Sequence, residues 1–284
     1  METYNKVWRV FFAVSLVSIA ILQFICTGFR PVIMPPEPAF IGQSTFCMCI
    51  SGIMLILVSA AIIFGINSHV VADYLGAFML LIIIIFHIPY NIKTNLLFLG
   101  GWGDAFKLLA FCGGALVVAT SLPTEKVSGI DAIADRLRPY GPYFFATTMI
   151  VFGIEHFVYP SFVATLVPAW AGFPLFWTYF AAVALIAAGA AIMFKIKVKL
   201  AANLLGITLF LWLIMLHIPR AVAAQKQDNQ KRSAALLKNP KDDTANGTKV
   251  SESTANEWTS VFEALGFSGI AFLIAGTYKP KVID

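Results

Sequence analysis

"IIIIFHIPYN" at residues 82–91 ends a long apolar run with His-Ile-Pro, and "LIMLHIPRAV" at residues 213–222 does the same. The chain has only 4 histidines, so finding two of them in the same short motif suggests a repeat. Shifting the sequence by the 130 positions that separate the two motifs also aligns AAIIFGI at 60–66 with AAIMFKI at 190–196. We therefore expect two copies of one structural unit.

The composition indicates an integral membrane protein. Of the 284 residues, 59% are hydrophobic and 12% are charged, whereas a soluble domain has about 25% charged residues. A helix needs about 20 apolar residues to cross a hydrocarbon core about 30 Å thick. Stretches of that kind predict an all-α membrane protein with eight transmembrane helices, at 9–28, 46–66, 72–89, 104–121, 142–159, 174–194, 200–219 and 258–276.

The last helix of each copy aligns at a different offset. Moving by 156 positions places Trp102 over Trp258 and Phe106 over Phe262, so residues have been inserted before the eighth span. The inserted segment, 223–252, is polar and poor in aromatic residues, so it lacks the apolar surface needed to fold alone. We expect its first part to extend the seventh helix and the rest to form an extracytoplasmic loop.

The two copies should have the same orientation, because each has an even number of spans. This predicts two tandem four-helix bundles related by a pseudo-two-fold axis along the membrane normal. The first unit is expected at 1–122 and the second at 142–284, with a cytoplasmic linker at 123–141.

The distribution of basic residues predicts the orientation in the membrane. Basic residues in short loops favour the cytoplasmic side. If the N-terminus is cytoplasmic, the short loops on the other side carry only Arg30, Lys93 and the nearby Lys107. We therefore expect a multi-pass protein of the bacterial inner membrane with both termini in the cytoplasm. The lipid bilayer is its expected partner, and nothing in the sequence suggests a nucleic-acid partner.

Residues 150–222 resemble the DoxX family of bacterial membrane proteins. The resemblance rests on Glu155-His156 in the first helix of the unit, on YPSFVATLVPAW at 159–170, on an Ala/Gly-rich second helix and on a third helix ending in a histidine. The first unit departs from this pattern, because Gln23-Phe24 aligns with Glu155-His156. The family name derives from a subunit associated with a thiosulfate:quinone oxidoreductase. The resemblance implies a four-helix membrane fold and quinone-linked redox work.

Four ionisable residues of the second unit form the candidate pocket. Glu155 and His156 end the fifth span, and His217 and Arg220 end the seventh, so all four are expected at the extracytoplasmic end. Ionisable groups within a membrane are costly and usually face the interior of the protein. A carboxylate, two imidazoles and a guanidinium at one depth suit a quinone head group or a proton relay.

A structural explanation of the same residues stays open. Arg220 can pair with Glu155, and the histidines can satisfy carbonyls that Pro89 and Pro219 release. A further alternative makes His87 and His217, which occupy equivalent repeat positions, the axial ligands of a haem or another metal.

Lys107 and Glu263 also occupy equivalent repeat positions, with opposite charges. Across a central axis they are expected to form an ion pair that joins the two units.

Three functions remain possible at this stage. The first is a quinone-linked redox component or accessory subunit, with a redox partner protein or a larger membrane complex as its partner. The second is a non-enzymatic membrane scaffold, and the third, the least favoured, is a small-molecule transporter. The sequence contains no dinucleotide-binding glycine fingerprint and no P-loop.

Overall fold

A computed structural model describes residues 2–123, 135–238 and 250–279, and all regular elements in these ranges are helical. The structure therefore supports an all-α protein. The long helices are α1 (Glu2–Cys26), α3 (Thr45–Phe64), α4 (Ser68–Ile82), α6 (Gly103–Thr120), α8 (Gly141–Val158), α10 (Pro174–Met193), α11 (Val198–Trp212), α12 (Ile218–Lys238) and α14 (Glu252–Thr277). The shorter ones include α2 (Ala39–Gly42), α5 (Ile88–Thr94) and α9 (Pro160–Ala164).

Seven helical segments of the described chain are long and apolar enough to cross a membrane. They correspond to seven of the eight expected spans. The remaining expected span, 142–159, coincides with α8, which is not among the seven. Glu155 and His156 near the end of α8 lower the mean hydropathy of this helix.

The helices of the two units are interleaved. α1 packs on α3 and α14, whereas α8 packs on α10 and α6. α4 packs on α6, α11 packs on α14, and α6 also contacts α14 at the centre. The first helix of each unit thus packs on the last helix of the other unit. The two expected units therefore share an extensive interface through their first and last helices.

Glycines allow the close approach between the units. A Cβ atom on Gly113 of α6 would lie 2.5 Å from the carbonyl oxygen of Gly141 at the start of α8. A Cβ atom on Gly269 of α14 would lie 3.0 Å from the carbonyl oxygen of Trp8 in α1. Small residues of this kind let helix backbones come together where lipid provides no hydrophobic driving force.

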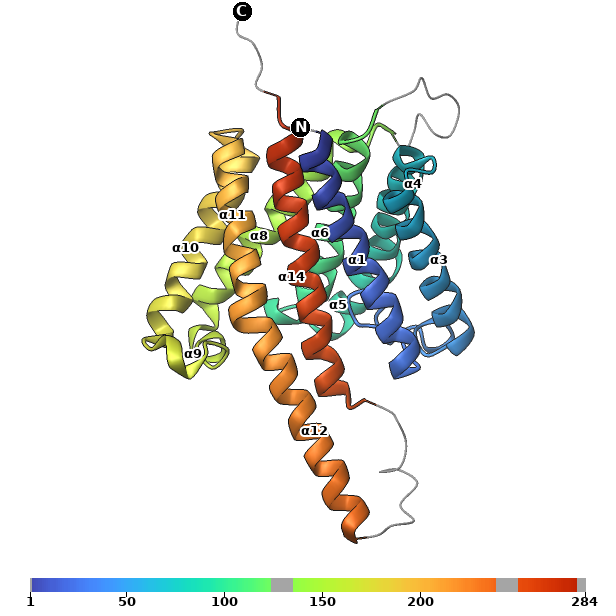
Figure 1. The fold of residues 1–284 in the computed structure, drawn as a ribbon, viewed down its shortest axis with the longest axis vertical. Helices are drawn as coiled ribbons and strands as arrows, with labels where there is room; N and C mark the ends of the chain where they lie inside the picture. Colours follow the sequence, from blue (N-terminus) through green and yellow to red (C-terminus); the bar gives the residue numbers. More distant parts are fainter. Residues whose placement is uncertain (1, 124–134, 239–249, 280–284) are drawn as a thin grey trace, which may run out of the picture.

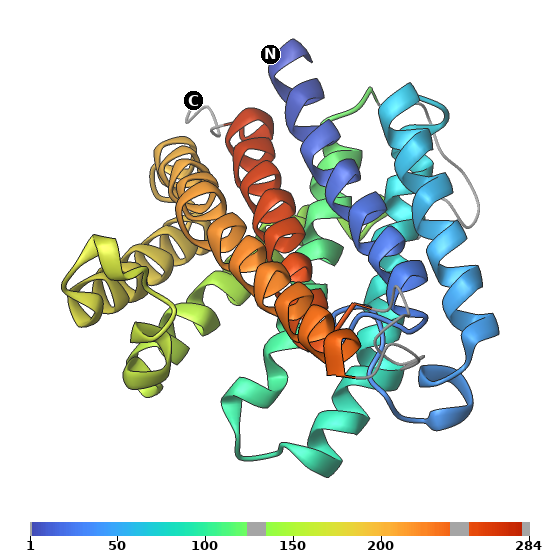
Figure 2. The same ribbon diagram turned by 60° about the horizontal axis from the view of Figure 1, so that its bottom comes forward.

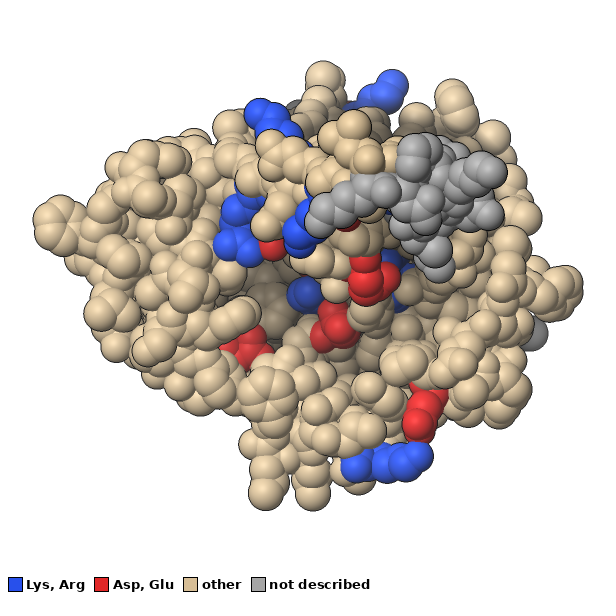
Figure 3. Space-filling model, turned by 90° about the horizontal axis from the view of Figure 1, so that it is seen from below, with Lys and Arg blue, Asp and Glu red and all other residues tan. Residues whose placement is uncertain are grey.

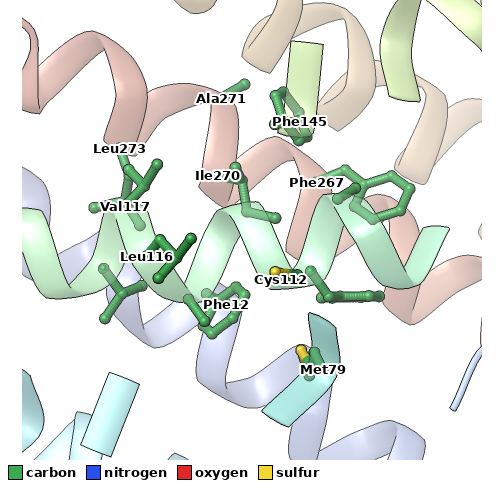
Figure 4. Close-up of a cluster of buried hydrophobic side chains, with 14 of the residues drawn as sticks. Phe12, Met79, Cys112, Leu116, Val117, Phe145, Phe267, Ile270, Ala271 and Leu273 are labelled. Atoms are coloured by element: carbon green, nitrogen blue, oxygen red, sulfur yellow. The ribbon is translucent and has the colours of Figure 1, made fainter. Parts of the chain in front are cut away.

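Phenylalanine rings fill the centre of the protein (Figure 4). The rings of Phe111 and Phe267 lie 5.2 Å apart between α6 and α14. Phe12 of α1 lies 6.2 Å from Phe111, and Phe145 of α8 lies 6.2 Å from Phe267. These spacings are within the range in which aromatic pairs attract each other.

Both His-Ile-Pro motifs interrupt their helices with a π-helical turn. The turns are η1 (Ile83–His87), between α4 and α5, and η5 (Leu213–His217), between α11 and α12. Pro89 and Pro219 follow them. A proline has no N–H, and its ring clashes with the carbonyl four residues earlier, so the wider turn accommodates it. In the first motif, Asn91 Nδ2 donates to the His87 carbonyl at 2.9 Å.

The start of α1 and the end of α14 lie at the same end of the protein, which we call the terminal end (Figure 1). α12 projects from the other end, as the turned view in Figure 2 also shows. Residues 223–238 of the polar insertion continue this helix, as expected for its first part. Residues 239–249 of the insertion and most of the expected linker at 123–141 lie outside the described residues.

Two contacts at the terminal end join distant parts of the chain: one ties the linker to the first unit, and the other joins the two units. Arg138 of η3 (Arg138–Tyr140) donates from Nε to both carboxylate oxygens of Asp73, each at 2.9 Å. This hydrogen bonding raises the pKa of the Arg138 guanidinium. On the other side of the bundle, Tyr4 Oη donates to Asn203 Oδ1 at 2.9 Å. We did not expect either contact from the sequence.

Candidate polar chamber

A cavity of ≈ 200 Å³ opens at the end of the protein opposite the termini. Figure 3 shows this end as a mainly tan surface in which acidic and basic side chains gather around a central hollow. We call the cavity the chamber. It lies between α6, α14 and the segment after α1, and it is lined by Pro31, Val32, Asp104, Lys107, Asn256, Thr259, Ser260 and Glu263.

Lys107 is the central cation of the chamber. Its Nζ lies 3.2 Å from Asp104 Oδ1, one helical turn away on α6, and 3.2 Å from Glu263 Oε2 on α14. The two residues expected to pair across the units are therefore in contact. Glu263 is only 4% exposed, so its carboxyl group is removed from bulk water, whereas the Lys107 side chain is 28% exposed.

Arg30 lies beside the chamber and was not predicted. It is 1% exposed, and its Nε donates to Thr259 Oγ1 at 3.0 Å. Its Nη2 donates to Glu252 Oε1 at 3.0 Å and also to Asn256 Oδ1. Arg30 is buried because the apolar residues Val32, Ile33 and Met34 fold inward and carry the segment with them. In the sequence, the apolar run after the arginine is the feature that could have indicated this burial.

Two carboxyl groups at this end have an oxygen without a hydrogen-bond partner. Glu263 Oε1 and Glu155 Oε1 are both buried, and no described residue donates to either. Glu155 interacts electrostatically with Lys107, although it belongs to α8. A buried polar atom without a partner costs about 1–3 kcal/mol, so these oxygens call for a donor.

The fixed charges at this end do not balance. Arg30 is paired with Glu252, and Arg220 is paired with Glu257. The Lys107 ammonium group contacts two carboxyl groups, those of Asp104 and Glu263, and it also acts electrostatically on a third, that of Glu155. The excess acid favours ligand atoms that donate hydrogen bonds, or protons held on the carboxyl groups.

The four residues of the predicted pocket are divided by the structure. Arg220 Nη2 donates to Glu257 Oε1 at 2.6 Å, so its partner is Glu257 of α14 and not Glu155. His217 interacts electrostatically with Arg220, Glu257 and Lys107. The alternative in which Arg220 pairs with Glu155 is wrong, because the first turns of α14 extend beyond the apolar run and supply the carboxylate of Glu257.

His156 bonds its own helix. Its Nδ1 lies 2.7 Å from the carbonyl oxygen of Phe152, one turn earlier on α8. None of the four predicted residues lines the chamber itself, although Lys107, which does, acts electrostatically on Glu155 and His217.

His87 lies in a different environment from His217. It is 1% exposed and hydrogen-bonds the backbone of Ile33, in the inward-folded segment of the first unit. The nearest charge that acts on it is Asp104. The inward-folded segment of the first unit therefore covers His87.

The corresponding segment of the second unit is open. Between α8 and α10 it carries large apolar side chains on the outside, among them Trp170, 65% exposed, and Phe173, 82% exposed. Because the segment of the first unit folds inward and that of the second faces outward, this end of the protein is less covered near Glu155 than near His87.

Comparison with known proteins gives one partial match. Residues 145–240 match a family model described as "Domain of unknown function (DUF8561)". The matched region holds Glu155, His156, His217 and Arg220, but it excludes Lys107 and Glu263. No curated protein and no solved structure matches the chain.

Proposed function

We propose that the chain crosses the membrane eight times and that its two units are related by a pseudo-two-fold axis. The π-helical turns at Ile83–His87 and Leu213–His217 support the 130-residue offset. So do the left-handed residues at the two short turns, Gly65 and Asn67 in one, Lys195 and Lys197 in the other. Phe111 and Phe267, 156 positions apart, pair with each other as residues on such an axis would.

Packing around the glycines supports a slightly different offset for the first helices. Gly113 meets Gly141, Phe144 and Phe145, whereas Gly269 meets Trp8, Phe11 and Phe12. The two sets of contacts become equivalent when the sequence is shifted by 133 positions. Leu22 and Gln23, rather than Gln23 and Phe24, then correspond to Glu155 and His156.

We also propose that the terminal end lies in the cytoplasm of a bacterial cell and that the chamber lies on the outer side of the inner membrane. The distribution of basic residues in short loops supports it. The relation to the DoxX family is part of the same proposal.

We propose that the chamber binds the head group of a quinone or quinol. The observation that carries this proposal is the buried, unpartnered Oε1 of Glu263 on the chamber wall, next to the Lys107 ammonium. A quinone carbonyl accepts a hydrogen bond from an ammonium group, and a quinol hydroxyl donates one to a carboxylate. The chamber offers both kinds of partner.

The size and position of the chamber suit a head group on a lipid tail. Pockets for drug-sized ligands occupy about 300–1,000 Å³. The chamber, at ≈ 200 Å³, admits only a small ring, so a tail would remain outside. The carboxyl group of Glu263 exchanges protons with the ligand in this proposal, and electrons pass to or from a redox partner protein.

The test is a binding titration in lipid nanodiscs. A short-chain ubiquinone is titrated into the wild-type protein, into Glu263→Gln and into the matched control Glu257→Gln, which changes the same group on the same helix but away from the chamber wall. We expect saturable binding that Glu263→Gln weakens at least tenfold and Glu257→Gln leaves nearly unchanged. Equal binding by all three proteins would contradict the proposal.

A non-enzymatic scaffold is the second candidate, because Lys107 and Glu263 join α6 to α14. The same titration separates the two. A scaffold predicts no saturable quinone binding by the wild-type protein, and a loss of thermal stability as the only effect of Glu263→Gln.

A further inference from the structure

We propose a second site, at the terminal end, that binds the head group of an anionic phospholipid. The site is a cavity of ≈ 230 Å³ between the start of α1, the end of α3 and the residue Leu122 that follows α6. It is independent of the chamber, which opens at the opposite end of the protein.

Two basic side chains of α1 line this cavity, Lys6 and Arg9. Arg9 is 6% exposed and is fixed by hydrogen bonds from Nη1 to the Ser121 carbonyl, at 3.0 Å, and to the Ser121 hydroxyl, at 3.3 Å. Its Nε–H has no acceptor among the described residues. Lys6 is exposed at the rim, so its ammonium group can reach a ligand that Arg9 holds.

The rest of the cavity wall is mainly apolar. Ile62, Ile63 and Phe64 at the end of α3 face Val10 of α1 and Leu122. Phe64 is 75% exposed and continues the apolar wall to the surface of the helix bundle. Cations on one side and apolar side chains on the other fit an amphiphile, with its phosphate at Lys6 and Arg9 and its acyl chains along α3. A free phosphate would use only half of this wall.

Glu2 is the natural competitor of the phosphate. Its carboxylate lines the same cavity and pairs with Arg9 Nη2, yet its side chain is 65% exposed. The carboxylate can therefore swing into water when a phosphate takes its place. Removing this charge should strengthen lipid binding, whereas a purely structural Glu2–Arg9 pair predicts no gain.

The test measures which lipids stay on the full-length protein. The protein is exchanged into mixed phosphatidylglycerol and phosphatidylcholine, and retained lipids are counted by native mass spectrometry. We expect one phosphatidylglycerol to be retained. Lys6→Met should weaken retention about fivefold, the factor for one basic residue at an anionic membrane surface. Glu2→Gln should strengthen it, and Lys199→Met, an exposed lysine at the same end, should not change it.

Three results would overturn the proposal. Equal losses for Lys6→Met and Lys199→Met would mean that only surface charge is sensed. A loss for Glu2→Gln would mean that the Glu2–Arg9 pair holds the fold and does not compete with a lipid. Displacement of the phosphatidylglycerol by millimolar inorganic phosphate would mean that the site takes the free anion and not the lipid.

Discussion

Replacing Lys107 should destabilise the protein more than replacing Glu263, although the two residues form one ion pair. Lys107 contacts two carboxylates, those of Asp104 and Glu263, each at 3.2 Å. Glu263→Gln therefore leaves Lys107 with Asp104, whose side chain is 41% exposed. Lys107→Met instead leaves Glu263, with a side chain 5% exposed, without its bonded cation.

The magnitudes follow from these partners. Breaking a buried pair by removing one member costs about 3–5 kcal/mol, and Lys107→Met should approach that range. Glu263→Gln should cost about 1–2 kcal/mol, because a cation with one remaining partner resembles a broken hydrogen bond to a charged group. The double variant Lys107→Met/Glu263→Met should regain most of the loss, since apolar residues often replace a buried pair at little cost.

The assay is thermal unfolding of the wild-type protein and the three variants in one detergent. Equal losses for the two single variants, or a double variant whose loss is the sum of both, would refute the assignment of Lys107 as the central cation of a buried network.

Three further predictions, one of which compares two glycine variants, test the packing of the helices, each by thermal unfolding in the same detergent. Asp73→Asn should cost about 3 kcal/mol, because it leaves the buried Arg138 guanidinium without its main counter-ion; a neutral effect would mean that the contact does not hold the terminal end. Gly113→Ala should cost about 3 kcal/mol because its Cβ meets backbone 2.5 Å away, whereas Gly65→Ala, in open space at φ 78°, should cost about 1 kcal/mol; the reverse order would contradict the close α6–α8 contact. Arg220→Met should cost no more than about 1 kcal/mol, because its ion pair on α12 is partly exposed, and a larger loss would place it inside the network.

Hydropathy located the helices well because it detects the apolar part of each one. It failed where a helix leaves the apolar region. α14 begins at Glu252, where Ser251 accepts a hydrogen bond from the Thr254 N–H, and not near the expected residue 258. Its first turns carry Glu252, Asn256 and Glu257, which decide the partners of Arg30 and Arg220.

Within the site, only a contact between equivalent positions of the repeat could be predicted from the sequence. Equivalent positions in two copies can meet at a symmetry axis, and this placed Lys107 against Glu263. Arg30 and Glu257 have no such constraint, because one lies in an irregular segment and the other beyond an apolar run. Which polar residues meet there depends on how those segments fold, and helix periodicity carries no information on that.

Photo-crosslinking can locate the quinone head group that we propose in the chamber between α6 and α14. An azidoquinone is irradiated with the protein in nanodiscs, and the labelled peptides are identified by mass spectrometry. We expect label on the segments around Lys107 and on residues 256–263. Excess unlabelled quinone should prevent this labelling, and the Glu263→Gln variant should not be labelled there. Label confined to the lipid-facing side of α10, unaffected by excess quinone, would contradict this proposal.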